Sequence, residues 1–259
     1  MGFFDSHSHL NDEKFDEDRD KIIKEIYESG VTNFITAGYS VQSSKKAVEI
    51  ANNYNFIYAT AGISPNDIPQ TEEELWKQLY EIKQLAKSNE KILAIGEIGL
   101  DYYWNKENKD IQKNAFIEQI KLANELDLPI VIHTRDAVSD TIQILKENQV
   151  KNKGIFHCCP QNRELIKEGV KLGFYISFAG PITFRNSKNA NEIIDLVPDD
   201  KILIETDSPY LSPEPVRGTK NTPSNVKYIA KKIADVKGLK IEEVEKITRE
   251  NTRKILKIK

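Results

Sequence analysis

Eight short apolar runs divide this 259-residue chain at regular intervals, and they constrain its fold more than any other feature. The runs are rich in Ile, Val, Phe and Tyr and almost continuously hydrophobic, which is typical of strands buried on both faces of a parallel sheet. They span 2–10, 31–38, 56–64, 92–101, 128–135, 154–159, 174–180 and 202–208. Longer amphipathic stretches lie between most of them and predict helices.

Two of the amphipathic stretches carry clear end signals. Over 16–30, three isoleucines fall on one helical stripe and Gly30 follows as a C-terminal cap. The stretch 71–90 opens with Thr71 and Glu74, which are spaced as a capping box. These signals support helices between the predicted strands.

Eight strand–helix units in about 250 residues match the expected size of a (β/α)8 barrel. We therefore predict an α/β protein with one TIM-like barrel domain over 1–259 and an active site at the C-terminal mouth, since no linker or repeat interrupts the chain. A doubly wound open sheet is the alternative. The even spacing of eight runs favours the barrel.

The composition limits the partners that this chain can attract. It is 39% hydrophobic and 30% charged with a net charge of −3, which is ordinary for a globular domain and gives no overall field toward nucleic acid or membranes. No apolar run approaches the roughly 18 residues of a membrane span. The two cysteines are adjacent and indicate no disulfide framework. We expect a cytoplasmic protein without a membrane partner, for which a monomer is compatible with the sequence.

Ionisable side chains occupy the C-terminal ends of five predicted strands, where barrel enzymes place their active sites. They include all four histidines of the chain: His7, His9, Glu97, His133, His157 and Asp207. Residues two apart in a strand face the same way, so His7 and His9 should both point into the barrel. Imidazole nitrogens and carboxylate oxygens suit zinc, manganese or iron. Six such groups exceed one tetrahedral site, so we predict two or more ions, with Glu97 able to bridge them.

Each of these residues also has a simpler interpretation. Glu97 could be an ion-pair partner, and Asp207 could start a turn. His157 with Cys158 or Cys159 could form a separate thiolate site, although strand alternation would turn Cys158 toward the helices. A shared metal site explains the whole set better, because uncompensated buried charge is costly.

Five motifs resemble those of the TatD family of metal-dependent hydrolases in order and spacing. They are "DSHSHL", "IGEIGLDYY", "VIHTRDA", "GIFHCC" and "LIETDSPYLSP", and the resemblance spans essentially the whole chain. It implies a TIM-like barrel that holds two or three divalent ions of magnesium, manganese or zinc. It also implies nuclease activity on DNA, often from the 3′ end. By motif, the family's ligands fall on the six residues given above.

The chain departs from the family pattern at two places. In "AGISPND", Ser64 stands where the resemblance places a histidine that would contact substrate or handle protons. A serine does not titrate near neutral pH. After the sixth strand, the sequence from His157 to Pro160 differs from the family's His-Cys-Phe-Ser-Gly, which alters the adjoining loop. We expect an intact metal centre beside an altered substrate pocket.

These observations predict hydrolysis of phosphodiester bonds in DNA or another nucleotide-containing substrate, of the 3′–5′ exonuclease type. Asp207 would orient the attacking water and accept its proton, and Glu97 would hold the ions at their working separation. Ser64, Tyr102 and Arg217 are the predicted substrate contacts. A tyrosine ring can stack on a base and a guanidinium can bind phosphate in a bidentate fork.

Alternatives remain at the level of both residues and function. Arg217 could equally be a solvated loop charge, and either Tyr102 or the neighbouring Tyr103 could pack in the core. The same metal centre could attack an acyl carbon, as in a D-aminoacyl-tRNA deacylase or another ester or amide hydrolase. A non-catalytic, metal-dependent nucleic-acid binder is a more distant alternative, because degenerate members should lose some ligands.

Overall fold

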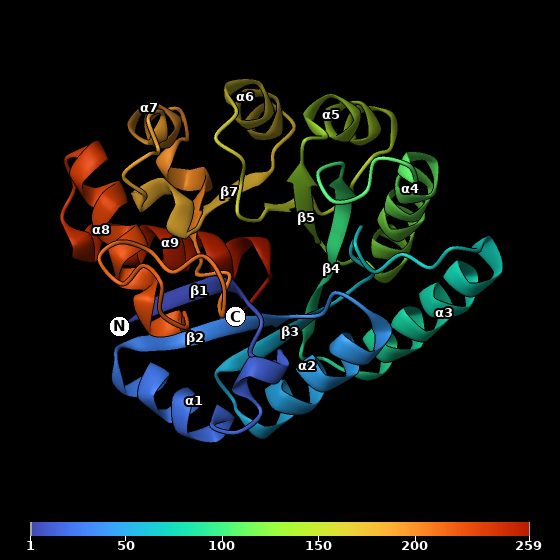
Figure 1. Cartoon of the computed structure of the whole chain (residues 1–259), viewed down its shortest axis with the longest axis horizontal. Coiled ribbons are helices and arrows are strands. Elements are labelled where there is room, and N and C mark those ends of the chain that lie inside the picture. The colour runs from blue at the N-terminus through green and yellow to red at the C-terminus, as the bar shows by residue number, and fades with distance from the viewer. Residues whose placement is uncertain (1, 259) are drawn as a thin grey trace.

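The computed structural model describes residues 2–258 and contains an eight-stranded parallel sheet in which each strand pairs with the next in the sequence. Figure 1 shows the strands arranged as a ring with helices around the outside. The strands are β1 (Phe3–Ser8), β2 (Val31–Ala37), β3 (Ile57–Ala61), β4 (Ile92–Asp101), β5 (Ile130–Arg135), β6 (Gly154–Phe156), β7 (Tyr175–Phe178) and β8 (Ile202–Ile204). Each predicted apolar run contains one of these strands.

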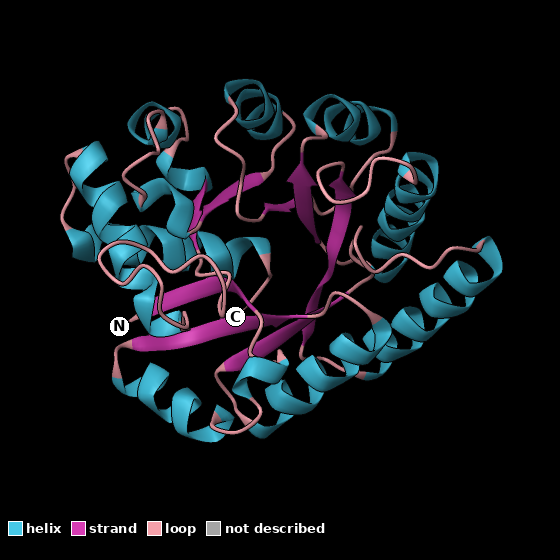
Figure 2. Cartoon of the chain, in the orientation of Figure 1, coloured by secondary structure: helices cyan, strands magenta, loops and turns pink. Residues whose placement is uncertain are grey.

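Helices follow the strands and cover the sheet from outside (Figure 2). The α-helices are α1 (Arg19–Glu28), α2 (Val41–Asn53), α3 (Glu72–Ser88), α4 (Lys109–Leu126), α5 (Val138–Glu147), α6 (Arg163–Lys171), α7 (Ala190–Asp195), α8 (Val226–Lys237) and α9 (Ile241–Ile255). Short 3-10 helices are η1 (Glu13–Phe15), η2 (Gly180–Thr183), η3 (Asp199–Lys201) and η4 (Pro223–Asn225). The predicted end signals operate as expected: Gly30 has a φ of +93° just beyond α1, and the Thr71 hydroxyl accepts from the Glu74 N–H at the start of α3.

The barrel closes where its first and last strands meet. The Asp207 N–H donates to the His7 carbonyl over 3.0 Å, and the His9 N–H donates to the Ser208 carbonyl over 2.7 Å. The buried Asp5 carboxylate adds side-chain bonds from the Thr206 N–H and hydroxyl. The predicted (β/α)8 barrel is therefore confirmed, because an open doubly wound sheet would leave these two edges apart.

A small second core fills the barrel beneath its mouth. Its members come from seven strands and from the end of α9: Phe4, Ile35, Ala94, Val131, Ile155, Tyr175, Leu203, Ile255 and Leu256. The inward residues of a TIM barrel pack in layers of this kind, so the interior is filled and is not a pore. The site-bearing strand ends therefore stand on a rigid base.

One domain accounts for residues 2–258, and the two terminal residues of the predicted 1–259 domain, Met1 and Lys259, lie outside the described residues. Within the described part of the chain, no helix has both the length and the apolar character needed to span a bilayer.

Candidate metal centre

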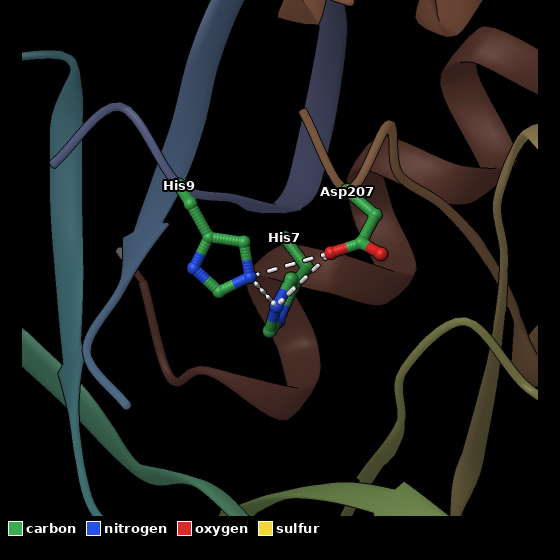
Figure 3. A group of neighbouring side chains, drawn as sticks. All are labelled: His7, His9 and Asp207. Atoms are coloured by element: carbon green, nitrogen blue, oxygen red, sulfur yellow. Dashed lines mark hydrogen bonds and ion pairs between the residues drawn. The ribbon is translucent and has the colours of Figure 1, made fainter. Parts of the chain in front are cut away.

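Three of the predicted side chains converge where β1 and β8 meet at the mouth. Figure 3 shows the rings of His7 and His9 and the Asp207 carboxylate pointing toward one another. The two Nε2 atoms lie 3.2 Å apart. Asp207 Oδ1 lies 3.3 Å from His9 Nε2 and 3.8 Å from His7 Nε2. This first donor group combines two imidazoles with one carboxylate.

Glu97, near the middle of β4, joins this group to a second one. Its Oε2 lies 3.5 Å from His7 Nε2 and 3.7 Å from His9 Nε2. Its Oε1 lies 3.0 Å from His133 Nδ1 and 3.4 Å from His157 Nε2. The two oxygens of one carboxylate thus face two different pairs of imidazoles, which is the arrangement of a bridging ligand.

The spacing of the donor atoms fits divalent ions. His133 Nδ1 and His157 Nε2 are 3.1 Å apart, so the measured donor separations in the two groups run from 3.0 to 3.8 Å. Donors about 2.1 Å from one tetrahedral ion lie about 3.4 Å apart. Donor atoms of His7, Glu97 and His157 also lie within 4.8 Å of one another, so the two groups adjoin. The residues present fit a centre for two ions.

The outer nitrogens of three histidines lie against acceptors. His9 Nδ1 lies 3.1 Å from the Ala37 carbonyl, and His133 Nε2 lies 2.9 Å from Asp101 Oδ2. His157 Nδ1 lies 3.3 Å from Glu205 Oε1 as an ion-pair contact without hydrogen-bond geometry. An acceptor at the outer nitrogen holds the proton there and leaves the lone pair of the inner nitrogen for a metal. The tautomers therefore suit ligation.

Asp101 and Glu205 are candidate site residues that the strand-end argument did not single out. Both are fully buried. Asp101 ends β4 and Glu205 directly follows β8, so an acidic residue at a strand end is the signal that could have identified them. Their roles depend on partners from other strands, because Glu205 also accepts from the Cys158 N–H over 2.6 Å.

Two glycines allow β4 to carry Glu97 so close to β5. Gly99 has a φ of +135°, and a Cβ there would lie 2.1 Å from the His133 carbonyl oxygen. A Cβ at Gly96 would lie 2.6 Å from the Val131 side chain. The "GEIG" sequence is therefore required by close backbone approach around the bridging carboxylate.

Burial and opposite charge together set the protonation of the centre. Burial favours the neutral form of Glu97, but the charge of His157 and hydrogen bonds from neighbouring imidazoles outweigh it and hold the pKa of Glu97 well below its usual range. Burial also opposes protonation of His9, yet Asp207 outweighs it and raises the pKa of His9. By contrast, burial and nearby His157 lower the pKa of His7. The Glu97 carboxylate is therefore ionised, and the imidazoles around it differ in how readily they take up a proton.

The family pattern described as TatD related DNase matches residues 4–257. This chain belongs to the TatD family. It is 45% identical over 258 residues to the uncharacterized metal-dependent hydrolase YabD of Bacillus subtilis (strain 168), covering 98% of this chain and 99% of that protein. It is 35% identical over 265 residues to the uncharacterized metal-dependent hydrolase YcfH of Escherichia coli (strain K12), covering 100% and 97%. The chain is therefore a metal-dependent hydrolase.

Solved structures support the fold of this TatD family member. The crystal structure of YJJV, a TatD homolog from Escherichia coli K12, superposes with a TM-score of 0.93 at 24% identity, covering 99% of this chain and 98% of that one. The organophosphorus hydrolase from Deinococcus radiodurans gives a TM-score of 0.65 at 12% identity, covering 99% and 92%. At these identities, both similarities concern the barrel alone.

The three predicted substrate contacts of this TatD protein lie in different surroundings. Ser64 is buried, and its hydroxyl donates to Asp67 Oδ2 over 2.6 Å. Tyr102 packs in the main core, where its hydroxyl donates to Asp140 over 2.7 Å and Lys109 lies over its ring. The structure therefore does not support base stacking by Tyr102.

Arg217 lies in the loop after β8 and is exposed. Its Nη1 donates to the Ser212 carbonyl over 3.1 Å, and its guanidinium lies 3.8 Å from the centroid of the Phe184 ring. These contacts hold the side chain against its own loop and leave part of its surface open. A phosphate contact by Arg217 stays a prediction.

The cysteines contradict the alternation argument. β6 ends at Phe156, and Cys158 follows with a φ of +37°, so strand geometry no longer applies there. It is Cys159 that packs in the main core with the helices. Burial, with the negative charge of Asp207, raises the pKa of Cys158 well above its usual value, which does not favour a thiolate ligand. The prediction that Cys158 faces the helices is wrong.

Replacing Asp101 with asparagine should weaken metal binding at the group that contains His133. The amide would remove the charge that holds the outer proton of His133, and loss of such a partner typically costs 10–100-fold in metal affinity, so we expect about that decrease. Isothermal titration of the metal-free protein with zinc measures it. Asp235→Asn, which alters an exposed ion pair with Lys231 on α8, is the control. Equal zinc affinity in the two variants would rule out the role given to Asp101.

Proposed function

We propose that this TatD protein hydrolyses phosphodiester bonds of DNA, removing nucleotides from the 3′ end of a strand. The observation that carries the proposal is the Glu97 carboxylate, whose two oxygens face two adjoining donor groups. Two-ion centres of this kind suit in-line displacement at phosphorus, because both the attacking and the leaving oxygen must be stabilised. The description of the matching family as TatD related DNase supports the same substrate class.

The residues of the candidate metal centre would have separate roles in hydrolysis. Divalent ions, when bound, would make water nucleophilic near neutral pH and neutralise charge developing on the phosphate. Asp207 is ionised at neutral pH, because burial is outweighed by the hydrogen bond and charge of His9 and its pKa is lowered. Its carboxylate could orient the attacking water at the mouth. Glu97 would fix the separation of the two donor groups, and Asp101 and Glu205 would hold the imidazoles in register.

A comparison of substrates tests the proposal. Protein reloaded separately with magnesium, manganese or zinc is incubated with 5′-labelled single-stranded DNA and with a D-aminoacyl-tRNA. We expect stepwise shortening of the DNA from its 3′ end and a much slower release of the amino acid. The acyl alternative draws support from Ser64, whose hydroxyl is engaged by Asp67 where the family pattern has a histidine.

The other outcomes are equally decisive. If the protein deacylates D-aminoacyl-tRNA faster than it cleaves DNA, ester hydrolysis by the same centre replaces DNA cleavage as the proposed reaction. Tight DNA binding with no turnover under any of the three ions would identify a binding protein. Shortening from the 5′ end would support nuclease activity but contradict the proposed 3′-to-5′ direction.

We also propose that the protein acts as a cytoplasmic monomer. The free thiols of Cys158 and Cys159 support a reducing compartment, where cysteines usually stay unpaired. Light scattering of the purified protein and fractionation of the source cell test the two parts separately.

A further inference from the structure

The segment after β4 places two large aromatic side chains in solvent at the mouth. The side chains of Tyr103 and Trp104 are 49% and 68% exposed, although residues of this size usually bury most of their surface. Their ring centroids lie 4.9 Å apart with the planes nearly perpendicular. Because this exposed aromatic pair lies beside the candidate metal centre, it is a candidate for ligand contact.

The same carboxylate that positions a metal ligand also positions these aromatics. Asp101 Oδ2 lies 2.9 Å from His133 Nε2, while Asp101 Oδ1 accepts from the N–H of Tyr103 over 3.0 Å and from that of Trp104 over 3.2 Å. One buried side chain therefore fixes the start of the aromatic segment relative to the metal centre. A substrate held by the rings would have its neighbouring bond near the catalytic groups.

A guanidinium completes the cluster from the next strand. Arg135 ends β5, two residues after His133, and its Cζ lies 3.8 Å from the Tyr103 ring centroid and 5.4 Å from that of Trp104. Among residues 2–258, the Arg135 guanidinium has no carboxylate or other hydrogen-bond partner. It keeps its donors for an incoming anion while its face covers an aromatic ring.

We propose that Tyr103, Trp104 and Arg135 form a stacking platform that binds an unpaired nucleobase and its adjoining phosphate. Aromatic faces accept any base, and an arginine beside them supplies the phosphate contact, which is the usual composition of single-strand binding sites. A paired base keeps its faces within the helix stack and cannot use the platform. This proposal rests on the nuclease function proposed above and specifies its substrate.

The chemistry favours a base over a protein partner. Tyr103 and Trp104 follow Asp101, which contacts His133, and the Arg135 cation lies beside both rings. The chain's net charge of −3 offers no general attraction for a polyanion, so a local platform must supply it.

The two tryptophans of the chain provide a matched pair of variants. Trp104 is the platform residue, and Trp76 on α3 is 51% exposed on the outer surface of the barrel. Steady-state cleavage is measured for Trp104→Ala, Trp104→Phe and Trp76→Ala on single-stranded oligonucleotides with either a normal or an abasic 3′-terminal nucleotide. We expect Trp104→Ala to raise KM about 5- to 100-fold on the normal strand. Trp104→Phe should recover part of this loss, and Trp76→Ala should match the unaltered enzyme.

Combining Trp104→Ala with removal of the terminal base tests whether Trp104 contacts that base. Removing the terminal base should cost the unaltered enzyme about as much as Trp104→Ala does, and the two changes together should cost little more than either alone. Additive losses, or an unchanged KM in Trp104→Ala, would overturn the platform. In that case cleavage by the unaltered enzyme would still establish the nuclease.

A binding measurement tests the stacking platform even if the protein does not cleave DNA. In a Trp76→Phe, Glu97→Gln protein, Trp104 is the remaining tryptophan and the strand is not consumed. Titration with single-stranded DNA should quench its fluorescence, whereas the abasic strand and a blunt duplex should quench it at least tenfold less well. Equal quenching by all three ligands would reject stacking, and absence of cleavage by the unaltered enzyme would separately reject the nuclease.

Discussion

Replacing Glu97 with glutamine is expected to lower kcat/KM by at least about 10³-fold, which corresponds to about 4 kcal/mol of transition-state stabilisation. The amide is nearly isosteric, but it removes the negative charge that faces four imidazoles and it cannot bridge two ions with equivalent oxygens. Initial rates on single-stranded DNA, together with the metal content of the purified variant, measure the effect. We expect bound metal to fall below two ions per chain.

Glu81→Gln is the matched control for this experiment. Glu81 lies on α3 and forms an exposed ion pair with Lys45, remote from the strand ends. Exposed pairs contribute little, so rate and metal content should match those of the unaltered enzyme. A Glu97→Gln protein that keeps a tenth of its activity, or that still holds two ions, would show that the carboxylate is not the bridge.

Removing metal with a chelator should abolish hydrolysis and lower the melting temperature by about 8–16 °C. An ion present at about 1,000 times its Kd stabilises the folded state by about 4 kcal/mol, and in a domain of this size each kcal/mol shifts Tm by about 2–4 °C. Calorimetry of the chelated protein, before and after metal is restored, measures the shift. Recovery of both Tm and activity distinguishes metal loss from irreversible damage.

The size of this metal effect should increase with pH. In the metal-free protein, nearby carboxylates outweigh burial and raise the pKa of His9, His133 and His157. Raised histidine pKa values stabilise the folded metal-free state below about pH 6.5, and that contribution is lost as pH rises through the folded values. Because the ligands must lose their protons to bind metal, divalent ions compete with protons most effectively at high pH. Equal Tm values with and without chelator at pH 8 would show that bound metal ions do not stabilise the fold.

Local patterns in the sequence were sufficient to predict the barrel and the convergence of the candidate ligands at its mouth. Continuous apolar runs identify buried parallel strands, and a parallel barrel brings every strand end to one mouth, so His7 and Asp207 could be paired across 200 residues of sequence. The prediction succeeds because strand order and direction alone determine which ends meet.

What the sequence did not predict depends on partners that only tertiary structure supplies. Tyr102 is buried because Asp140 and Lys109 approach it from outside its strand, while its neighbours Tyr103 and Trp104 remain exposed. The candidate role of the fully buried Glu205 depends on His157 and Cys158, which follow β6. Periodicity also fails once a strand ends, as it does at Cys158.

The seam between the first and last strands has a consequence for protein synthesis. His7 and His9 are translated before Asp207, whose N–H donates to the His7 carbonyl and which follows about 200 residues later. Pairing across such a separation in sequence is slow and cannot occur before the late partner exists. A chain that stops before Asp207 therefore lacks one side of the first donor group, and the candidate metal centre can form only after Asp207 has been translated.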